Sequence, residues 1–114
     1  MNRTVSAWMA AAVFFAAGSG LALAQPAVDV AAAEALMKKS GCNKCHSISA
    51  KKEGPPYKET AAKYKGKADG EQKLFTHLST NPKVKVDGKE ELHDSLKSKN
   101  DDDIRNVVRY VLSR

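Results

Sequence analysis

Two cysteines and a histidine occupy one stretch of five residues, Cys42-Asn43-Lys44-Cys45-His46. In this C-x-x-C-H pattern, both thiols can project from one side of a single helical turn and form thioether bonds with the two vinyl groups of one porphyrin. The histidine that follows is carried over the ring face, where an imidazole nitrogen can bind iron. The motif therefore predicts one covalently attached haem c, held through Cys42 and Cys45, with its iron bound by His46.

Other uses of a C-x-x-C pair fit this chain less well. Zinc sites and thioredoxin-like redox pairs share the spacing. The chain has no further cysteine, and His77 and His93 are 16 residues apart, which does not match the spacing of a zinc finger. No βαβ pattern surrounds the motif, as a thioredoxin-like protein would require. A plain or redox-active disulfide between Cys42 and Cys45 remains the alternative.

The first 24 residues have the features of a signal peptide. Arg3 precedes an alanine-rich apolar stretch, and Ala22-Leu23-Ala24 supplies a small-x-small cleavage pattern. We expect export to the periplasm, an oxidising compartment in which thiols are normally bonded or otherwise occupied. An uncleaved anchor that tethers the protein to a membrane is the alternative, although the apolar run is near the lower length limit for a span. We expect no stable membrane insertion after cleavage.

Cleavage after Ala24 would leave residues 25–114, which is the size of one small domain. Domains of this size bury a modest core and often need additional stabilisation, such as a disulfide, a metal ion or a cofactor. The aromatic residues of this part are few: Tyr57, Tyr64, Phe75 and Tyr110. A covalently held porphyrin would provide this stabilisation, because it offers a large flat apolar surface for packing.

The chain is basic, with 19 lysines and arginines against 13 acidic residues. All of these charges except Arg3 lie after the predicted leader. One interpretation is a solvated lysine-rich surface, and another is electrostatic steering toward acidic redox partners. We expect no nucleic-acid partner, because the lysines are spread along the chain and an exported protein seldom meets one.

Hydrophobic residues recur at helical spacing in four segments. We expect a first helix over residues 30–40 with Asp29 as its N-cap, ended by Gly41. Further helices are expected over about 57–65 and 69–79, and from Asn100 or Asp101 to near the C-terminus. Residues 82–99 read as mostly irregular, with Asp87-Gly88 suggesting a turn, and we predict no strand.

With these residues in view, the chain resembles the small bacterial class I cytochromes c of the c-551/c-552 kind. The likeness covers nearly all of the sequence after the leader. It rests on the attachment motif and on three further segments, namely Leu36-Met37-Lys38-Lys39-Ser40-Gly41, Gly54-Pro55-Pro56-Tyr57-Lys58 and the last predicted helix. The resemblance implies an all-α fold, about four helices packed around one covalently attached haem. It also implies that the carbonyl of Pro55 binds and orients the proximal histidine.

One feature of that family is missing from this chain. Its members usually supply a methionine as the second iron ligand, but Met1, Met9 and Met37 all precede the attachment motif. His93 stands where that methionine is expected, 21 residues before the C-terminus and just ahead of the last predicted helix. We therefore expect the iron to be bound by His46 and His93.

Other sixth ligands remain open. His77 is the second candidate, although a histidine on a predicted helix is more often a surface or packing residue. Lys83, Lys85 and Lys89 lie near His93 in the sequence, and water or an open position are further possibilities. A second imidazole predicts a low-spin centre with a lower potential than methionine ligation produces.

We expect a non-enzymatic, monomeric electron carrier that exchanges single electrons with larger redox proteins. Two strong axial ligands would block access of a substrate to the iron, which favours electron transfer over catalysis. The alternative is a haem-based binder or sensor of a small gas, in which a displaceable His93 on a mobile loop gives way to the ligand. The sequence does not identify the donor or the acceptor.

Overall fold

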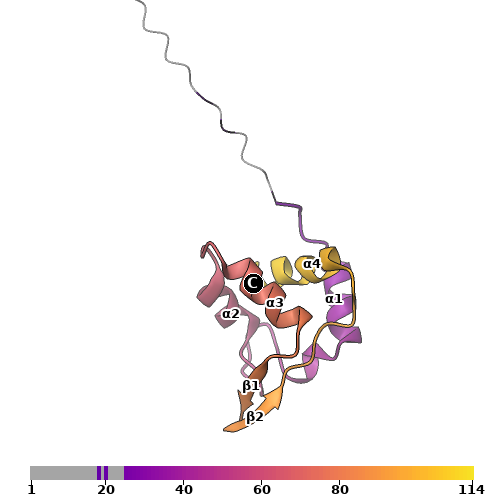
Figure 1. Cartoon of the computed structure of the whole chain (residues 1–114), viewed down its shortest axis with the longest axis vertical. Helices are drawn as coiled ribbons and strands as arrows, with labels where there is room; N and C mark the ends of the chain where they lie inside the picture. The colour runs from indigo at the N-terminus through magenta and orange to yellow at the C-terminus, as the bar shows by residue number, and fades with distance from the viewer. Residues whose placement is uncertain (1–17, 19, 21–24) are drawn as a thin grey trace, which may run out of the picture.

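The structure is a computed structural model that describes Gly18, Gly20 and residues 25–114 (Figure 1). The predicted signal peptide over residues 1–24 therefore lies outside the described residues, apart from those two glycines. All four predicted helices are confirmed, each to within about one residue of the expected bounds. They are α1 (Val30–Lys39), α2 (Tyr57–Tyr64), α3 (Gly70–Ser79) and α4 (Asp101–Leu112).

The two ends of α1 follow from its flanking residues. The Oδ1 of Asp29 accepts a hydrogen bond from the backbone N–H of Ala32 at 3.0 Å, which confirms the predicted N-cap. Gly41 adopts φ = +76°, a left-handed conformation that glycine tolerates without steric cost. The chain therefore leaves α1 sharply and enters the single 3-10 turn η1 (Cys42–Lys44).

The N-cap of α4 is Asn100, whose side-chain oxygen accepts from the N–H of Asp102 at 2.9 Å. Asp101, Asp102 and Asp103 fill its first turn, where negative charge is favoured by the helix dipole. One face of α4 is apolar, and Val107 and Val108 are 1% and 0% exposed. Such a stripe is what a helix needs in order to lie across several neighbours.

The core forms where α4 packs against α1, α2 and α3. Figure 1 shows α4 beside α1 at the end of the molecule from which the N-terminal segment leaves. Apolar residues from every helix except α3, and from the loop before α4, make up the main buried cluster; they are Ala33, Met37, Tyr57, Leu96, Ile104, Val107, Tyr110 and Val111. Phe75 and Leu78 of α3 pack against it. This arrangement confirms the predicted small, predominantly helical fold.

The prediction that residues 82–99 contain no strand was wrong. The strands β1 (Lys83–Val86) and β2 (Lys89–Leu92) form an antiparallel hairpin with Val86 paired to Lys89. Asp87 and Gly88 make the two-residue turn with φ values of 49° and 79°, the positive angles that a tight hairpin of this type requires. The strands are only four residues long and mostly charged, so that backbone pairing across the turn, rather than side-chain pattern, forms this hairpin.

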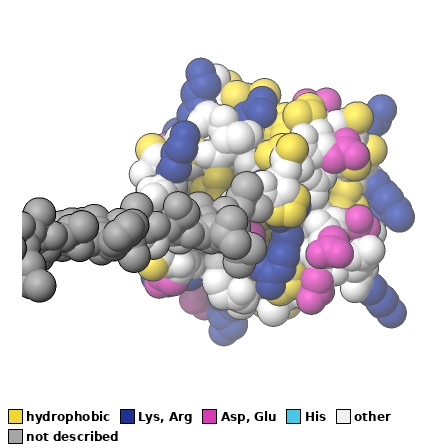
Figure 2. All heavy atoms as spheres, turned by 90° about the horizontal axis from the view of Figure 1, so that it is seen from above, with side chains coloured by type: hydrophobic (Ala, Val, Ile, Leu, Met, Phe, Trp, Pro, Cys, Tyr) yellow, Lys and Arg dark blue, Asp and Glu magenta, His cyan; other side chains and the backbone are white. Residues whose placement is uncertain are grey.

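The charged side chains do not gather in one patch on the face shown in Figure 2. Lysine and arginine side chains are spread around it, with acidic side chains between them. Among the residues that the structure describes, no helix has the length and apolar character to cross a bilayer.

Candidate haem site

The two cysteines and His46 are held on one tight backbone turn. The carbonyl oxygen of Cys42 accepts hydrogen bonds from the N–H of Cys45 at 3.2 Å and of His46 at 3.0 Å. Both thiols are partly exposed and are not joined in a disulfide. The turn therefore presents two thiols and one imidazole from adjacent positions, as covalent attachment of a porphyrin requires.

The environment of the thiols does not favour redox exchange between them. Burial raises the pKa of the Cys42 thiol above its ordinary value. The pKa of Cys45 is also raised, first because its thiol donates to the carboxylate of Glu53, with Sγ and Oε2 3.4 Å apart. Thiol–disulfide oxidoreductases need a thiolate with a lowered pKa. These pKa directions argue against a redox-active disulfide.

His46 is held by the backbone of the Gly54-Pro55 segment. Its Nδ1 lies 2.9 Å from the carbonyl oxygen of Pro55. A carbonyl only accepts, so Nδ1 carries the proton in this bond and Nε2 has the lone pair that could bind a metal. The N–H of Gly54 also donates to the carbonyl of Cys45 at 2.8 Å. The ring is thus fixed in both tautomer and direction.

Gly54 makes room for that ring. A Cβ atom placed on Gly54 would lie 2.3 Å from Cε1 of His46, which is far inside van der Waals contact. The ring of Tyr57 also stacks on that of His46, with centroids 5.5 Å apart and an interplanar angle of 21°. Gly54 and Tyr57 therefore restrict the position of the imidazole of His46. Sequence reasoning did not assign either contact, although the Gly-Pro-Pro-Tyr run contained both residues.

His93 lies opposite this arrangement, directly after β2. Its ring centroid is 6.1 Å from that of His46, with the planes tilted by 54°. The backbone at His93 is held on both sides, because its N–H donates to the carbonyl of Pro82 at 2.8 Å and its carbonyl accepts from Asn81 Nδ2 at 3.0 Å. The hairpin that the sequence did not predict is therefore the element that returns His93 toward His46.

The spacing of these two rings fits a shared metal ion. A metal binds an imidazole nitrogen at about 2 Å, so that two imidazoles on opposite sides of one ion have centroids roughly 6 Å apart. His46 presents a free Nε2, and the ring of His93 brings a second imidazole to the same spacing. The donor set of two thiols and two imidazoles thus matches the needs of a haem c.

His77 also belongs to this cluster. It projects from α3, and its ring centroid is 4.4 Å from that of His93, with a tilt of 57°. Burial lowers the pKa of both His77 and His93 below the ordinary value, and the neighbouring histidines lower both further. Both rings are therefore favoured in the neutral form. The structure brings together all three histidines of the chain, whereas Lys83, Lys85 and Lys89 have exposed positions on the hairpin.

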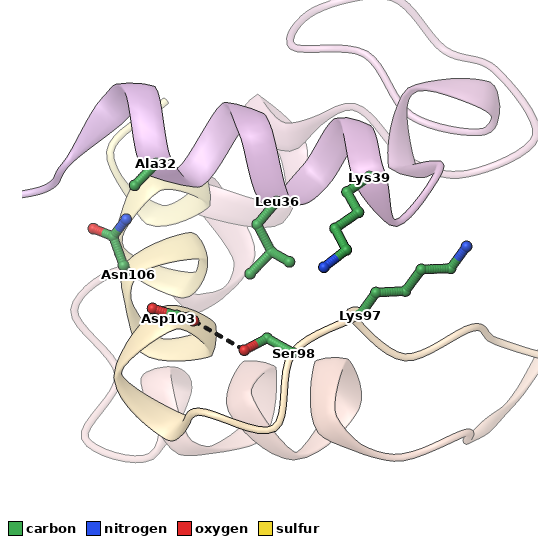
Figure 3. A pocket seen from close by; sticks show the side chains of 7 residues that line it. All are labelled: Ala32, Leu36, Lys39, Lys97, Ser98, Asp103 and Asn106. Atoms are coloured by element: carbon green, nitrogen blue, oxygen red, sulfur yellow. Dashed lines mark hydrogen bonds between the residues drawn. The ribbon is translucent and has the colours of Figure 1, made fainter.

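A hollow elsewhere on the surface has no part in this site. It lies between α1 and the start of α4, and neither a cysteine nor a histidine lines it (Figure 3). Ser98 donates to Asp103 there at 2.9 Å, which ties the preceding loop to the first turn of α4. Lys39 points its ammonium group toward the hollow and Lys97 points its own away from it, and both lysines are exposed.

Known proteins resemble this chain in sequence and in fold. The family model described as Cytochrome c matches residues 30–114. The crystal structure of the class 1 cytochrome MtoD from Sideroxydans lithotrophicus is similar with a TM-score of 0.73 and 45% identity, over 76% of this chain and 97% of that one. Cytochrome c-551 of Pseudomonas aeruginosa is 36% identical over 71% of this chain and 75% of its own length.

A shorter match is found with cytochrome c-551 of Allochromatium vinosum, which is 51% identical over 43 residues. That match covers 38% of this chain and 46% of the relative. Together these findings identify covalently attached haem c, with its iron, as the cofactor, and monohaem electron transfer as the activity. The chain belongs to the cytochrome c family.

Proposed function

We propose that this protein is a periplasmic one-electron carrier whose haem iron is bound by His46 on one side and by His93 on the other. The observation that carries the proposal is the 6.1 Å separation of these two rings. His93 also occupies the sequence position at which the resembling cytochromes supply a methionine. No methionine follows the attachment motif, so that none is available for this role.

The attachment residues in this proposal are Cys42 and Cys45, each forming one thioether bond. Pro55 has the role of orienting His46, and the 2.9 Å contact between its carbonyl and Nδ1 supports that role. The hydrogen bond keeps the proton on Nδ1 and increases electron donation from Nε2. Gly54 and Tyr57 also lie against the same ring.

When bound, the haem supplies an iron that gains and loses a single electron. With both His46 and His93 bound to it, the iron would have no position left for a substrate, which favours a carrier over an enzyme. A second imidazole does not raise the potential as methionine does. We therefore expect a lower midpoint potential than that of the methionine-ligated relatives.

The backbone contacts of His93 favour the carrier over a gas sensor. A sensor would need His93 to leave the iron readily on a mobile loop. Here the N–H and the carbonyl of His93 are both hydrogen-bonded, to Pro82 and Asn81. Three residues later the loop is fixed again, because the N–H of Leu96 donates to the carbonyl of Leu78 at 2.9 Å.

The periplasm, the signal peptide over residues 1–24 and a monomeric domain over residues 25–114 belong to the same proposal. The small-x-small pattern at Ala22-Leu23-Ala24 and the covalent haem motif support export. The partners are other redox proteins that donate and accept single electrons. The excess of basic residues would raise the rate of encounter with acidic partners, and this rate would fall with ionic strength.

Low-temperature EPR and optical spectra of the oxidised holoprotein test the ligand assignment. We expect a low-spin signal typical of two imidazoles in the wild type, lost in His93→Ala. Persistence of that signal in His93→Ala would refute the proposal. Carbon monoxide added to the reduced wild type gives a second measurement: slow or absent binding supports the carrier, and rapid, complete binding supports the sensor.

A further inference from the structure

The Nδ1 atom of His93, the proposed second iron ligand, lacks the hydrogen bond that such a nitrogen normally makes. It is buried and has no hydrogen-bond partner among the described residues. Metal-bound histidines almost always donate the N–H of their second nitrogen to an acceptor, which fixes the tautomer and the ring orientation. His46 has such an acceptor in the carbonyl of Pro55. Two polar groups lie near the ring of His93 and could serve as its acceptor, the backbone of Asp94 and the side chain of His77.

His77 is the polar side chain that the structure brings against the ring of His93. The two centroids are 4.4 Å apart and the planes are tilted by 57°, so that the rings are in direct contact. His77 is half-buried on α3, whose Leu74 is in turn buried. Its imidazole carries one nitrogen that accepts when the ring is neutral.

The backbone holds the two histidines in this relation. The carbonyl of Leu78, the residue after His77, accepts from the N–H of Leu96 in the loop that follows His93. Asn81, at the end of the segment that leaves α3, donates to the carbonyl of His93 at 3.0 Å. These two hydrogen bonds join the segment around His77 to the segment around His93, and so they keep the two rings in contact.

We propose that His77 is a positioning residue for His93: with haem bound, a nitrogen of the His77 ring, which here contacts the His93 ring without a hydrogen bond, accepts from Nδ1–H of His93 and fixes the plane of that ring. The inference rests on the proposed function, in which His93 binds the iron through Nε2. Proton retention on Nδ1 leaves the Nε2 lone pair directed at the metal. Electron donation by the ring increases, which stabilises oxidised over reduced iron and slows the departure of His93.

Two substitutions separate hydrogen bonding from packing. His77→Phe keeps an aromatic ring of similar shape against His93 and removes the acceptor. His77→Gln restores an acceptor oxygen on a flexible side chain. Gln72→Phe is the matched control, because Gln72 is an exposed residue of the same helix. All variants are studied as haem-loaded protein.

We expect His77→Phe to raise the rate constant of carbon monoxide binding to the reduced protein by about tenfold, the lower end of the usual effect of such supporting groups. The midpoint potential is expected to rise, and a tenfold change in the preference of His93 for oxidised over reduced iron corresponds to about 59 mV. The Nδ1–H proton of His93 should lose protection from exchange in NMR spectra. His77→Gln should recover much of all three properties, and Gln72→Phe should match the wild type.

The outcomes distinguish this inference from the proposed function. Wild-type values of all three properties in His77→Phe, with the bis-imidazole signal lost in His93→Ala, would overturn the inference alone. Equal changes in His77→Phe and His77→Gln would also overturn it, because packing would then explain them. Loss of the bis-imidazole signal in His77→Phe with retention in His93→Ala would make His77 the ligand and overturn both.

Discussion

Asn106 of α4 and Asp29 at the start of α1 bind each other through two hydrogen bonds. The Oδ1 of Asn106 accepts from the backbone N–H of Asp29 at 2.9 Å, and its Nδ2 donates to the carbonyl of Asp29 at 2.8 Å. Asp29 also caps α1 through its side chain. One amide therefore joins the first helix to the last across 77 residues of sequence.

Asn106→Ala should destabilise the protein by about 1–2 kcal/mol, because each net hydrogen bond contributes about 1 kcal/mol. Urea unfolding followed by circular dichroism measures this change in the free energy of unfolding. The optical spectrum of the haem should stay as in the wild type, since Asn106 does not contact any of the three histidines. A change below about 0.3 kcal/mol would show that the two bonds add nothing to stability.

Gly54→Ala should disturb His46 specifically. The added Cβ would lie 2.3 Å from Cε1 of the ring, and the resulting overpacking should cost about 1–3 kcal/mol. Because the ring has to move, the yield of haem-loaded protein should fall and its axial-ligand spectrum should change. Both are measured by absorption and EPR on protein purified from a strain that attaches haem c.

Gly70→Ala is the control for that experiment. Its Cβ would meet the carbonyl oxygen of Tyr64 at 2.3 Å, so that the fold is strained to a similar degree away from His46. It should lower stability and leave the spectrum unchanged. Equal spectra for the two variants would contradict the assigned role of Gly54.

His93→Met should raise the midpoint potential. The thioether would occupy the position at which the resembling cytochromes carry methionine, and ligation by methionine and histidine favours reduced iron. Spectroelectrochemistry of wild type and variant measures the shift, with EPR showing the loss of the second imidazole. An unchanged potential together with an unchanged EPR signal would mean that His93 does not bind the iron.

We expect Tyr110 to make the protein less stable at alkaline pH. Burial and the hydrogen bond that its hydroxyl donates to Glu34 at 2.9 Å raise its pKa above the ordinary value. The pKa of Tyr110 is therefore higher in the folded protein than in the unfolded chain, where it is about 10. The contribution of Tyr110 to the free energy of unfolding is complete below about pH 10 and is lost as the pH rises through the folded pKa.

Tyr110→Phe should accordingly reduce that pH dependence. Urea unfolding at several values between about pH 8 and about pH 11 measures it. The difference in unfolding free energy between wild type and variant should shrink as the pH rises, because only the wild type has this hydroxyl to ionise. A difference that stays constant over this range would contradict the raised pKa of Tyr110.

Local sequence determined much of this protein. The attachment motif depends on five consecutive residues, and the caps at Asp29 and Asn100 act on the helix that each precedes. Such features form within a turn or two of the backbone, so that spacing alone is sufficient to predict them. The apolar stripe of α4 likewise predicted a helix that would be buried on one face.

The hairpin was the part of the fold that local pattern did not predict. Val84 and Val86 alternate with lysines in β1, and β2 is exposed along its whole length. Strands this short carry little side-chain signal, and they form because the Asp87-Gly88 turn lets two backbones pair.

Tertiary structure alone decided how the three histidines meet. The sequence placed His93 by its distance from the C-terminus and made His77, on a predicted helix, the second candidate for the iron ligand. Their rings come within 4.4 Å because α3 packs on α4 while the hairpin reverses the chain and returns His93 toward His46. Contacts of that kind depend on the packing of elements distant in sequence, which the spacing of residues along the chain does not specify.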